Sequence, residues 1–136
     1  MNKISGIIVN HNSTFEGEIE FDKSIKNIRN TRKVNNQNYI IPGFVDLHCH
    51  GGNGFDTMEG ANSIVNMSKY HLMHGTTSIM PTTWTNNFEE TFEALEGFNK
   101  IKEDNLNLLG IHLEGPFINP DKLGAQPNLT QEPSLE

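Results

Sequence analysis

Residues 40–50 read Ile-Ile-Pro-Gly-Phe-Val-Asp-Leu-His-Cys-His, and this segment decides the fold class. Pro42 and Gly43 predict a turn, and the residues after them predict a single strand. Side chains two positions apart on a strand point to the same face, so His48 and His50 converge on one point. Cys49 points to the opposite face. The sequence therefore predicts a strand that ends in a pair of imidazoles.

The residues that follow alternate between signals for helix and strand. A glycine-rich loop at 51–60 precedes a predicted helix at 62–74, which Gly75 closes. β-Branched residues between 76 and 83 predict a second strand, and residues 107–114 predict a third. Strands that alternate with helices indicate a parallel sheet covered by helices, in an α/β barrel or a doubly wound sheet.

A second helix is predicted between the second and third strands. Asn87 is a typical N-cap residue, and Glu90 three places later completes a capping pair. The helix is expected to reach about residue 103. Its apolar face is expected to consist of Phe88, Phe92, Leu95 and Ile101.

Residues 1–41 differ from residues 42–136 in their pattern of apolar and charged side chains. Ile4 and the apolar run at 7–9 suggest a first strand. Residues 15–21 then alternate between apolar and charged side chains, as a half-buried strand does. We therefore expect a small antiparallel β unit before the α/β part.

Composition excludes several classes of function. The formal net charge is -7, and residues 41–136 hold 13 acidic against 4 basic residues, so a groove for a nucleic-acid backbone is not expected. The short apolar run near the N-terminus predicts neither a signal peptide nor a membrane span. Cys49 is the single cysteine, which indicates a reducing compartment and a cytoplasmic protein.

Ionisable side chains stand at the ends of two predicted strands. His48 and His50 end the first, and Glu114 ends the third. The carboxyl ends of parallel strands hold the active site in α/β folds, and imidazole with carboxylate suits zinc, iron or manganese. Asp46 lies on the same face as the histidines, where it could orient an imidazole as an acceptor.

Each of these residues also has a structural interpretation. A bare His-x-His is common in solvated loops, and a glutamate before a turn can be a surface residue. We interpret His112 as a packed structural histidine. His71 and His74 lie near the end of the first predicted helix, where partly charged imidazoles favour the helix dipole, and we interpret both as structural.

Two further residues lie near the predicted site. Trp84 follows the second strand and is expected to line a pocket wall. Cys49 faces away from the site, so a catalytic thiol is not expected. The loop at 51–54 lacks the Lys-Ser/Thr that phosphate-cradling loops carry.

The motif Pro-Gly-Phe-Val-Asp-Leu-His-Cys-His-Gly at 42–51 resembles the first barrel strand of the amidohydrolase superfamily. A narrower resemblance lies in Gly-Ile-His-Leu-Glu-Gly-Pro-Phe-Ile-Asn-Pro at 110–120 and Gly-Ala-Gln-Pro at 124–127. Together with Asp-Thr-Met at 56–58 and His-Gly-Thr-Thr at 74–77, these motifs resemble the N-acetylglucosamine-6-phosphate deacetylase family.

The resemblance implies an architecture and a reaction. Residues 42–136 would supply the first three strand–helix units of a TIM-like (β/α)8 barrel, and residues 1–41 would supply part of a small β-sandwich domain. The implied reaction is hydrolysis of N-acetylglucosamine 6-phosphate to glucosamine 6-phosphate and acetate. A divalent ion would polarise the acetamide and lower the pKa of a water, and a carboxylate base would move its proton.

The resemblance also implies roles for individual residues. Glu114 would be the principal metal ligand, with His48 and His50 available for a one- or two-metal site, zinc or iron being expected. Gln126, which is His in many relatives, and Ala125 would contact the substrate. The full-length enzyme would be a homodimer that binds a small amino-sugar phosphate and neither nucleic acid nor membrane.

Three strands cannot close an eight-stranded barrel, which typically needs ~250 residues. The family's catalytic aspartate and remaining histidine ligands would lie downstream, so no catalytic residue is expected within these 136 residues. We therefore expect the chain to be a fragment that is inactive alone. Two alternatives stay open: an amidohydrolase acting on a cyclic amide, as dihydroorotases and hydantoinases do, and a non-enzymatic binding module.

Overall fold

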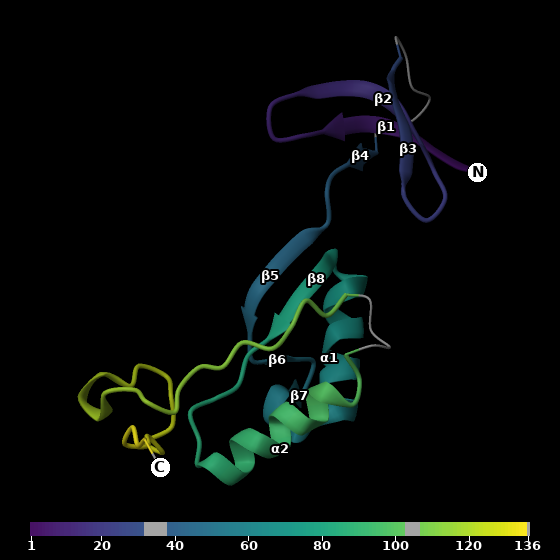
Figure 1. Cartoon of the computed structure of the whole chain (residues 1–136). Coiled ribbons are helices and arrows are strands. Elements are labelled where there is room, and N and C mark those ends of the chain that lie inside the picture. Colours follow the sequence, from purple (N-terminus) through teal and green to yellow (C-terminus); the bar gives the residue numbers. More distant parts are fainter. Residues whose placement is uncertain (32–37, 103–106, 136) are drawn as a thin grey trace. The chain divides into compact units, whose positions relative to one another are not determined.

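The structure is a computed structural model, and it describes residues 1–31, 38–102 and 107–135. It divides into two compact units, Met1–Pro42 and Gly43–Glu136. Figure 1 shows a β-sheet in the first unit and strands with helices in the second. The predicted α/β organisation is confirmed. Across the described ranges, no helix combines the length and apolarity needed to cross a membrane.

The first unit is a four-stranded sheet in the order β3-β2-β1-β4. β1 (Asn2–Val9) pairs antiparallel with β2 (Thr14–Phe21), and β2 pairs antiparallel with β3 (Ile25–Asn30). The sequence predicted an antiparallel unit, but β4 (Tyr39–Ile40) pairs with β1 in parallel. β3 was not predicted, because all six of its residues are exposed and it carries no alternating apolar pattern.

Glu20 is a buried acid in this sheet, with 5% of its surface exposed. Lys3 Nζ lies 2.7 Å from its Oε1, and Arg29 also contacts Oε1. Hydrogen bonds from Lys3 and then from Arg29 lower the pKa of Glu20 to about 2. Glu20 shares the charged face of β2 with Glu18, and the cations of the two neighbouring strands both cover and compensate it.

The second unit is built on a parallel pair, β5 (Phe44–Cys49) and β8 (Thr76–Pro81). The predicted glycine-rich loop contains a small hairpin of β6 (Gly51–Gly52) and β7 (Phe55–Asp56). Its two-residue turn is Asn53-Gly54, with φ of 55° and 82°. Positive φ at both central residues is the type I′ geometry that Asn-Gly favours.

Helix α1 (Ala61–Met73) follows the 3₁₀ turn η1 (Thr57–Glu59) and lies alongside β8 (Figure 1). Gly75 has a φ of 96°, a conformation that ends helices and favours glycine, so this predicted end is confirmed. α2 (Phe88–Asn99) begins at Asn87, whose side chain accepts a hydrogen bond from the Glu90 amide. A second 3₁₀ turn, η2, covers Pro120–Lys122.

The predicted apolar face of α2 was wrong at its first two positions, whereas Ile101 packs against the core as predicted. Phe88 and Phe92 are 45% and 61% exposed, whereas the buried residues of this helix are Thr91, Ala94, Gly97 and Phe98. Glycine stands at position 97 because α2 approaches the start of α1 closely there: a Cβ on Gly97 would lie 2.9 Å from the Ala61 amide nitrogen. The helix also ends before the predicted limit, and residue 103 itself lies outside the described residues.

The core of the second unit lies between the parallel pair and the two helices. It contains Cys49, Ile64, Met67, Ile79 and Phe98. On the face of β5 opposite the histidines, Cys49 reaches this core, but Val45 and Leu47 are 60% and 57% exposed. α1 packs on β8 rather than on the first half of β5.

The predicted third strand, 107–114, is not a regular strand. It makes two isolated parallel bridges to the β8 region, Ile79 with Leu108 and Thr82 with His112. The register moves by one residue between them, which interrupts the ladder as a bulge does. The described part of the unit thus contains two parallel strands and an extended segment rather than three complete strand–helix units.

Candidate metal centre

The end of β5 carries two histidines, and hydrogen bonds to Thr57 and Thr82 hold the backbone around them. The carbonyl of His50 accepts hydrogen bonds from the Thr57 amide at 2.8 Å and the Thr57 hydroxyl at 3.0 Å. The amide of Cys49 donates to Thr82 Oγ1 at 3.0 Å. Asp46 accepts from the backbone amide of His48 at 3.1 Å, so its contact is with main chain and not with an imidazole ring. These bonds fix the segment from which both rings project.

The extended segment at 107–114 brings Glu114 to the same place. The His112 amide donates to the Pro81 carbonyl at 2.8 Å, and the His112 carbonyl accepts from the Thr83 amide at 3.0 Å. The Glu114 amide donates to Thr83 Oγ1 at 3.2 Å. Pairing with the end of β8 therefore carries Glu114 to the end of β5, as the strand-end argument predicted.

Three donor atoms converge there. Glu114 Oε2 lies 2.8 Å from His48 Nε2 and 3.1 Å from His50 Nε2, and the two nitrogens lie 3.1 Å apart. Ligands placed 2.0–2.2 Å from one tetrahedral ion are separated by roughly 3.4 Å, so a divalent ion would need only a small expansion of this triangle. Within the described ranges, these residues form the one group of three ionisable side chains arranged to hold a metal.

The carboxylate oxygen itself supports a fit to a cation. Glu114 Oε2 is buried and has no hydrogen-bond partner among the described residues, although two ring nitrogens approach it. A buried acceptor without a donor is unfavourable by about 1–3 kcal/mol or more. A cation between the three atoms would compensate it, so the residues present fit a metal ion.

The imidazole of His50 is held in one orientation. Its Nδ1 lies 3.2 Å from the Thr82 carbonyl, and its ring stacks on Trp84 with centroids 3.7 Å apart and an interplanar angle of 14°. A hydrogen on Nδ1 donated to that carbonyl leaves the Nε2 lone pair directed at the centre. The His50 side chain is 18% exposed and that of His48 is 53% exposed, so one side of the centre is open.

His112 lies beside the centre but was interpreted as structural. Its ring centroid is 5.0 Å from that of His48, and its Nδ1 is buried without a hydrogen-bond partner among the described residues. The structure thus places the His112 ring beside that of His48.

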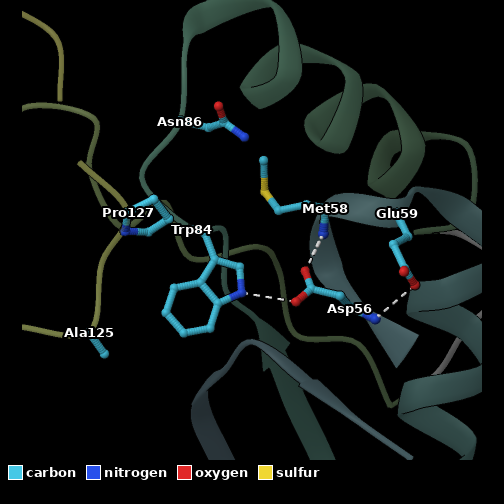
Figure 2. Close-up of a pocket in the computed structure, with 7 residues that line it drawn as sticks. All are labelled: Asp56, Met58, Glu59, Trp84, Asn86, Ala125 and Pro127. Atoms are coloured by element: carbon cyan, nitrogen blue, oxygen red, sulfur yellow. Dashed lines mark hydrogen bonds between the residues drawn. The ribbon is translucent and has the colours of Figure 1, made fainter. Parts of the chain in front are cut away.

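A cavity of about 470 Å³ adjoins the centre through Trp84. The Trp84 indole donates to Asp56 Oδ2 at 2.9 Å, and Figure 2 shows Ala125 and Pro127 on the other side of the ring from Asp56. Gln126 uses its side-chain oxygen to accept from the Thr85 amide at 2.7 Å. The cavity is lined by Asp56, Met58, Glu59, Trp84, Asn86, Ala125 and Pro127.

The threonines around the centre were missed as positioning residues. Thr57, Thr82, Thr83 and Thr85 are fully buried. In the sequence, Thr82 and Thr83 were interpreted only as β-branched strand formers, and Thr57 only as part of the motif at 56–58. The available signal was the run Thr82-Thr83-Trp84-Thr85, where hydroxyls continue beyond the end of a strand and can bond to neighbouring backbone.

Comparisons with known proteins identify relatives of this arrangement. The sequence model of the Amidohydrolase family matches residues 39–136. N-acetylglucosamine-6-phosphate deacetylase from Bacillus subtilis is 41% identical over 102 residues, which cover 70% of this chain and 26% of that protein. The chain thus spans about a quarter of the length of the curated relatives it matches.

Two solved structures are similar to the whole chain. The crystal structure of N-acetylglucosamine-6-phosphate deacetylase from Thermotoga maritima matches with a TM-score of 0.85 and 31% identity, covering 98% of this chain and 38% of that one. A mutant of the Mycobacterium smegmatis enzyme in complex with N-acetyl-D-glucosamine-6-phosphate matches with a TM-score of 0.79, covering 97% of this chain and 37% of that one. Its identity of 21% shows a common fold alone.

Proposed function

This chain belongs to the amidohydrolase family, and from that premise we propose that its protein removes the acetyl group of N-acetylglucosamine 6-phosphate. The products are glucosamine 6-phosphate and acetate. The relatives at 35–41% identity are N-acetylglucosamine-6-phosphate deacetylases, which supports this substrate over other amides. The motif at 110–120, followed by Gly-Ala-Gln-Pro at 124–127, supports the same choice over a cyclic amide.

The observation that carries the proposal is the convergence of His48, His50 and Glu114 on one point. These residues would hold one divalent ion, with zinc or iron proposed from the mixture of imidazole and carboxylate. Such an ion supplies Lewis acidity toward the acetamide carbonyl. Binding and orienting the substrate are roles of the protein's own residues.

The surrounding residues bind and orient. The Thr82 carbonyl holds the His50 ring through Nδ1, and stacking on Trp84 limits its rotation. The cavity beyond Trp84 is proposed to receive the amino sugar, with Ala125 on its wall. Gln126 would contact the substrate through its amide nitrogen, because its oxygen is already bonded to the Thr85 amide. Asp46 would act through the His48 backbone.

The same premise extends to architecture and setting. We propose residues 42–136 as part of a (β/α)8 barrel and residues 1–41 as part of a small β-sandwich domain. The parallel β5–β8 pair with its helices and the sheet of the first unit support that division. A homodimer and a cytoplasmic location are proposed on the same basis, and Cys49 is a free, buried thiol.

Acetate release from N-acetylglucosamine 6-phosphate tests the function directly. The full-length gene product containing these residues is compared with its Glu114→Gln variant, and with Glu93→Gln as a control at an exposed position on α2. Glutamine keeps the size of Glu114 but removes its charge, so release should fall at least about a hundred-fold. The control should keep the original rate.

Two outcomes would contradict the proposal. Acetate release that persists in the Glu114→Gln variant would show that Glu114 is not a metal ligand. No release from a folded, metal-loaded protein would exclude this substrate and direct the search to dihydroorotate and hydantoins.

A further inference from the structure

His71 turns away from its own helix and reaches the loop after the two histidines. It lies in the last turn of α1, and its Nε2 is 3.2 Å from the Gly51 carbonyl oxygen and 3.4 Å from Cys49 Sγ. His74, three residues later, instead places its Nδ1 2.8 Å from the Tyr70 carbonyl of the same helix. Both histidines lie at the end of α1 as predicted, but His71 also reaches outside its own helix.

The Gly51 carbonyl accepts from two directions. The Cys49 thiol donates to it at 3.3 Å, and His71 Nε2 lies within hydrogen-bond distance of it. Gly51 is covalently joined to His50, whose own carbonyl is held by Thr57. The two peptide units after the His50 side chain are therefore fixed, one by the turn before α1 and one by the end of α1.

The neighbouring Gly52 shows how closely His71 packs on this loop. A Cβ built on Gly52 would lie 2.5 Å from His71 Nε2, a distance that real side chains do not adopt. Tyr70 also contacts the His71 ring edge-on, with centroids 5.6 Å apart. The imidazole is thus confined between a ring and a backbone, which limits the positions from which it can donate.

We propose that His71 is a positioning residue for the metal-binding pair. Its Nε2–H donates to the Gly51 carbonyl and couples the last turn of α1 to the backbone that carries His48 and His50. A preorganised ligand loses less conformational freedom when it binds an ion, and partners of this kind change metal affinity by about ten- to a hundred-fold. This inference rests on the proposed function, because it takes His48, His50 and Glu114 as metal ligands.

The test measures zinc affinity, which is independent of turnover. Metal-free full-length protein is titrated with Zn²⁺ against a chromogenic chelator, as wild type and as His71→Ala, His71→Gln, His71→Asn and His74→Ala. Glutamine extends its amide about as far as Nε2 and can donate to Gly51, whereas asparagine is too short. We expect His71→Ala and His71→Asn to weaken zinc binding about ten- to a hundred-fold. His71→Gln should restore most of the affinity, and His74→Ala should change it less than about two-fold.

Gln and Asn carry the same amide group and differ in the length of the side chain. A difference in zinc affinity between these two variants therefore reports whether the amide reaches the Gly51 carbonyl, and the comparison does not depend on the folding of the alanine variant. Unfolding of the metal-free proteins in urea identifies a merely structural role, which would lower stability while leaving the zinc affinity of the folded protein unchanged. Equal affinity of wild type and His71→Asn, or equal weakening by Gln and Asn, would overturn the inference.

A Glu114→Gln variant separates this inference from the function beneath it. If wild type binds zinc, Glu114→Gln loses it and His71→Asn keeps it, the inference on His71 alone is wrong. If wild type binds no zinc, or Glu114→Gln binds it equally well, the centre itself is wrong and the role of His71 is overturned with it.

Discussion

The two units hold their buried polar groups by different means. In the first unit, Glu20 is compensated by the charges of Lys3 and Arg29, both about half exposed. In the second, the buried polar residues include four fully buried threonines, and the bonds of Thr57 and Thr82 go to backbone groups around the histidines. Ion pairs respond to pH and salt, whereas bonds between neutral hydroxyls and peptides do not.

The difference indicates how the candidate centre is kept in place. The hydroxyl groups that hold the backbone of Cys49, His50 and Glu114 are neutral, so these anchors add no charge of their own beside the ligands. In the first unit, by contrast, the buried carboxylate of Glu20 is compensated by the partly exposed charges of Lys3 and Arg29. Three changes test this contrast between the units.

The largest effect is expected from truncating a core side chain of the second unit. Ile79 is fully buried, so Ile79→Ala should lower the free energy of unfolding by about 2–5 kcal/mol through lost burial and a residual cavity. The matched change Ile28→Ala, at a position 43% exposed in the first unit, should lower it by less than about 1 kcal/mol. Urea unfolding measures both, and equal losses would show that the contrast in burial is wrong.

Removing one hydroxyl should have a smaller effect that salt does not change. Thr82→Val leaves the buried Cys49 amide without its acceptor, which should lower the free energy of unfolding by about 1–3 kcal/mol. Thr82→Ser keeps the hydroxyl and serves as the control. The same urea measurement is repeated at low and high salt, and a loss that shrinks with salt would contradict a neutral anchor.

The smallest effect is expected from titrating Glu20. The Glu20 pKa is lowered from 4.5 to about 2 in the folded protein, so its contribution to stability is complete above pH 4.5 and is lost as pH falls toward about 2. NMR signals of β1 and β2, followed in urea at decreasing pH, should show this loss. A Glu20→Gln variant should show a weaker dependence, and an equal dependence would assign the loss to another carboxyl.

Local signals predicted the parts of the fold that depend on single residues. Gly75 marked the end of α1 because its positive φ excludes most side chains, and Asn87 marked the start of α2 because its side chain caps the first turn. The alternation at 15–21 likewise predicted β2. In these cases the deciding interaction lies within a few residues, so the sequence contains it.

Features that depend on distant neighbours were not predictable in the same way. The buried side of α2 follows Gly97, because close approach to α1 matters more than the size of Phe88 or Phe92. The register change between Ile79–Leu108 and Thr82–His112 likewise depends on pairing and not on local propensity. His48, His50 and Glu114 were expected at one edge from strand direction, but the positioning contacts of Thr82 and His71 required the structure.

The buried Cys49 thiol gives this chain a chemical reporter of its own. Burial raises the pKa of Cys49, so the thiolate that reacts with alkylating reagents is scarce, and the chain has no other cysteine to compete with it. Cys49 lies between His48 and His50 in the sequence, and its sulfur is 3.4 Å from His71 Nε2. The rate at which Cys49 is alkylated therefore records how often this strand end opens to solvent, and it does so without an introduced label.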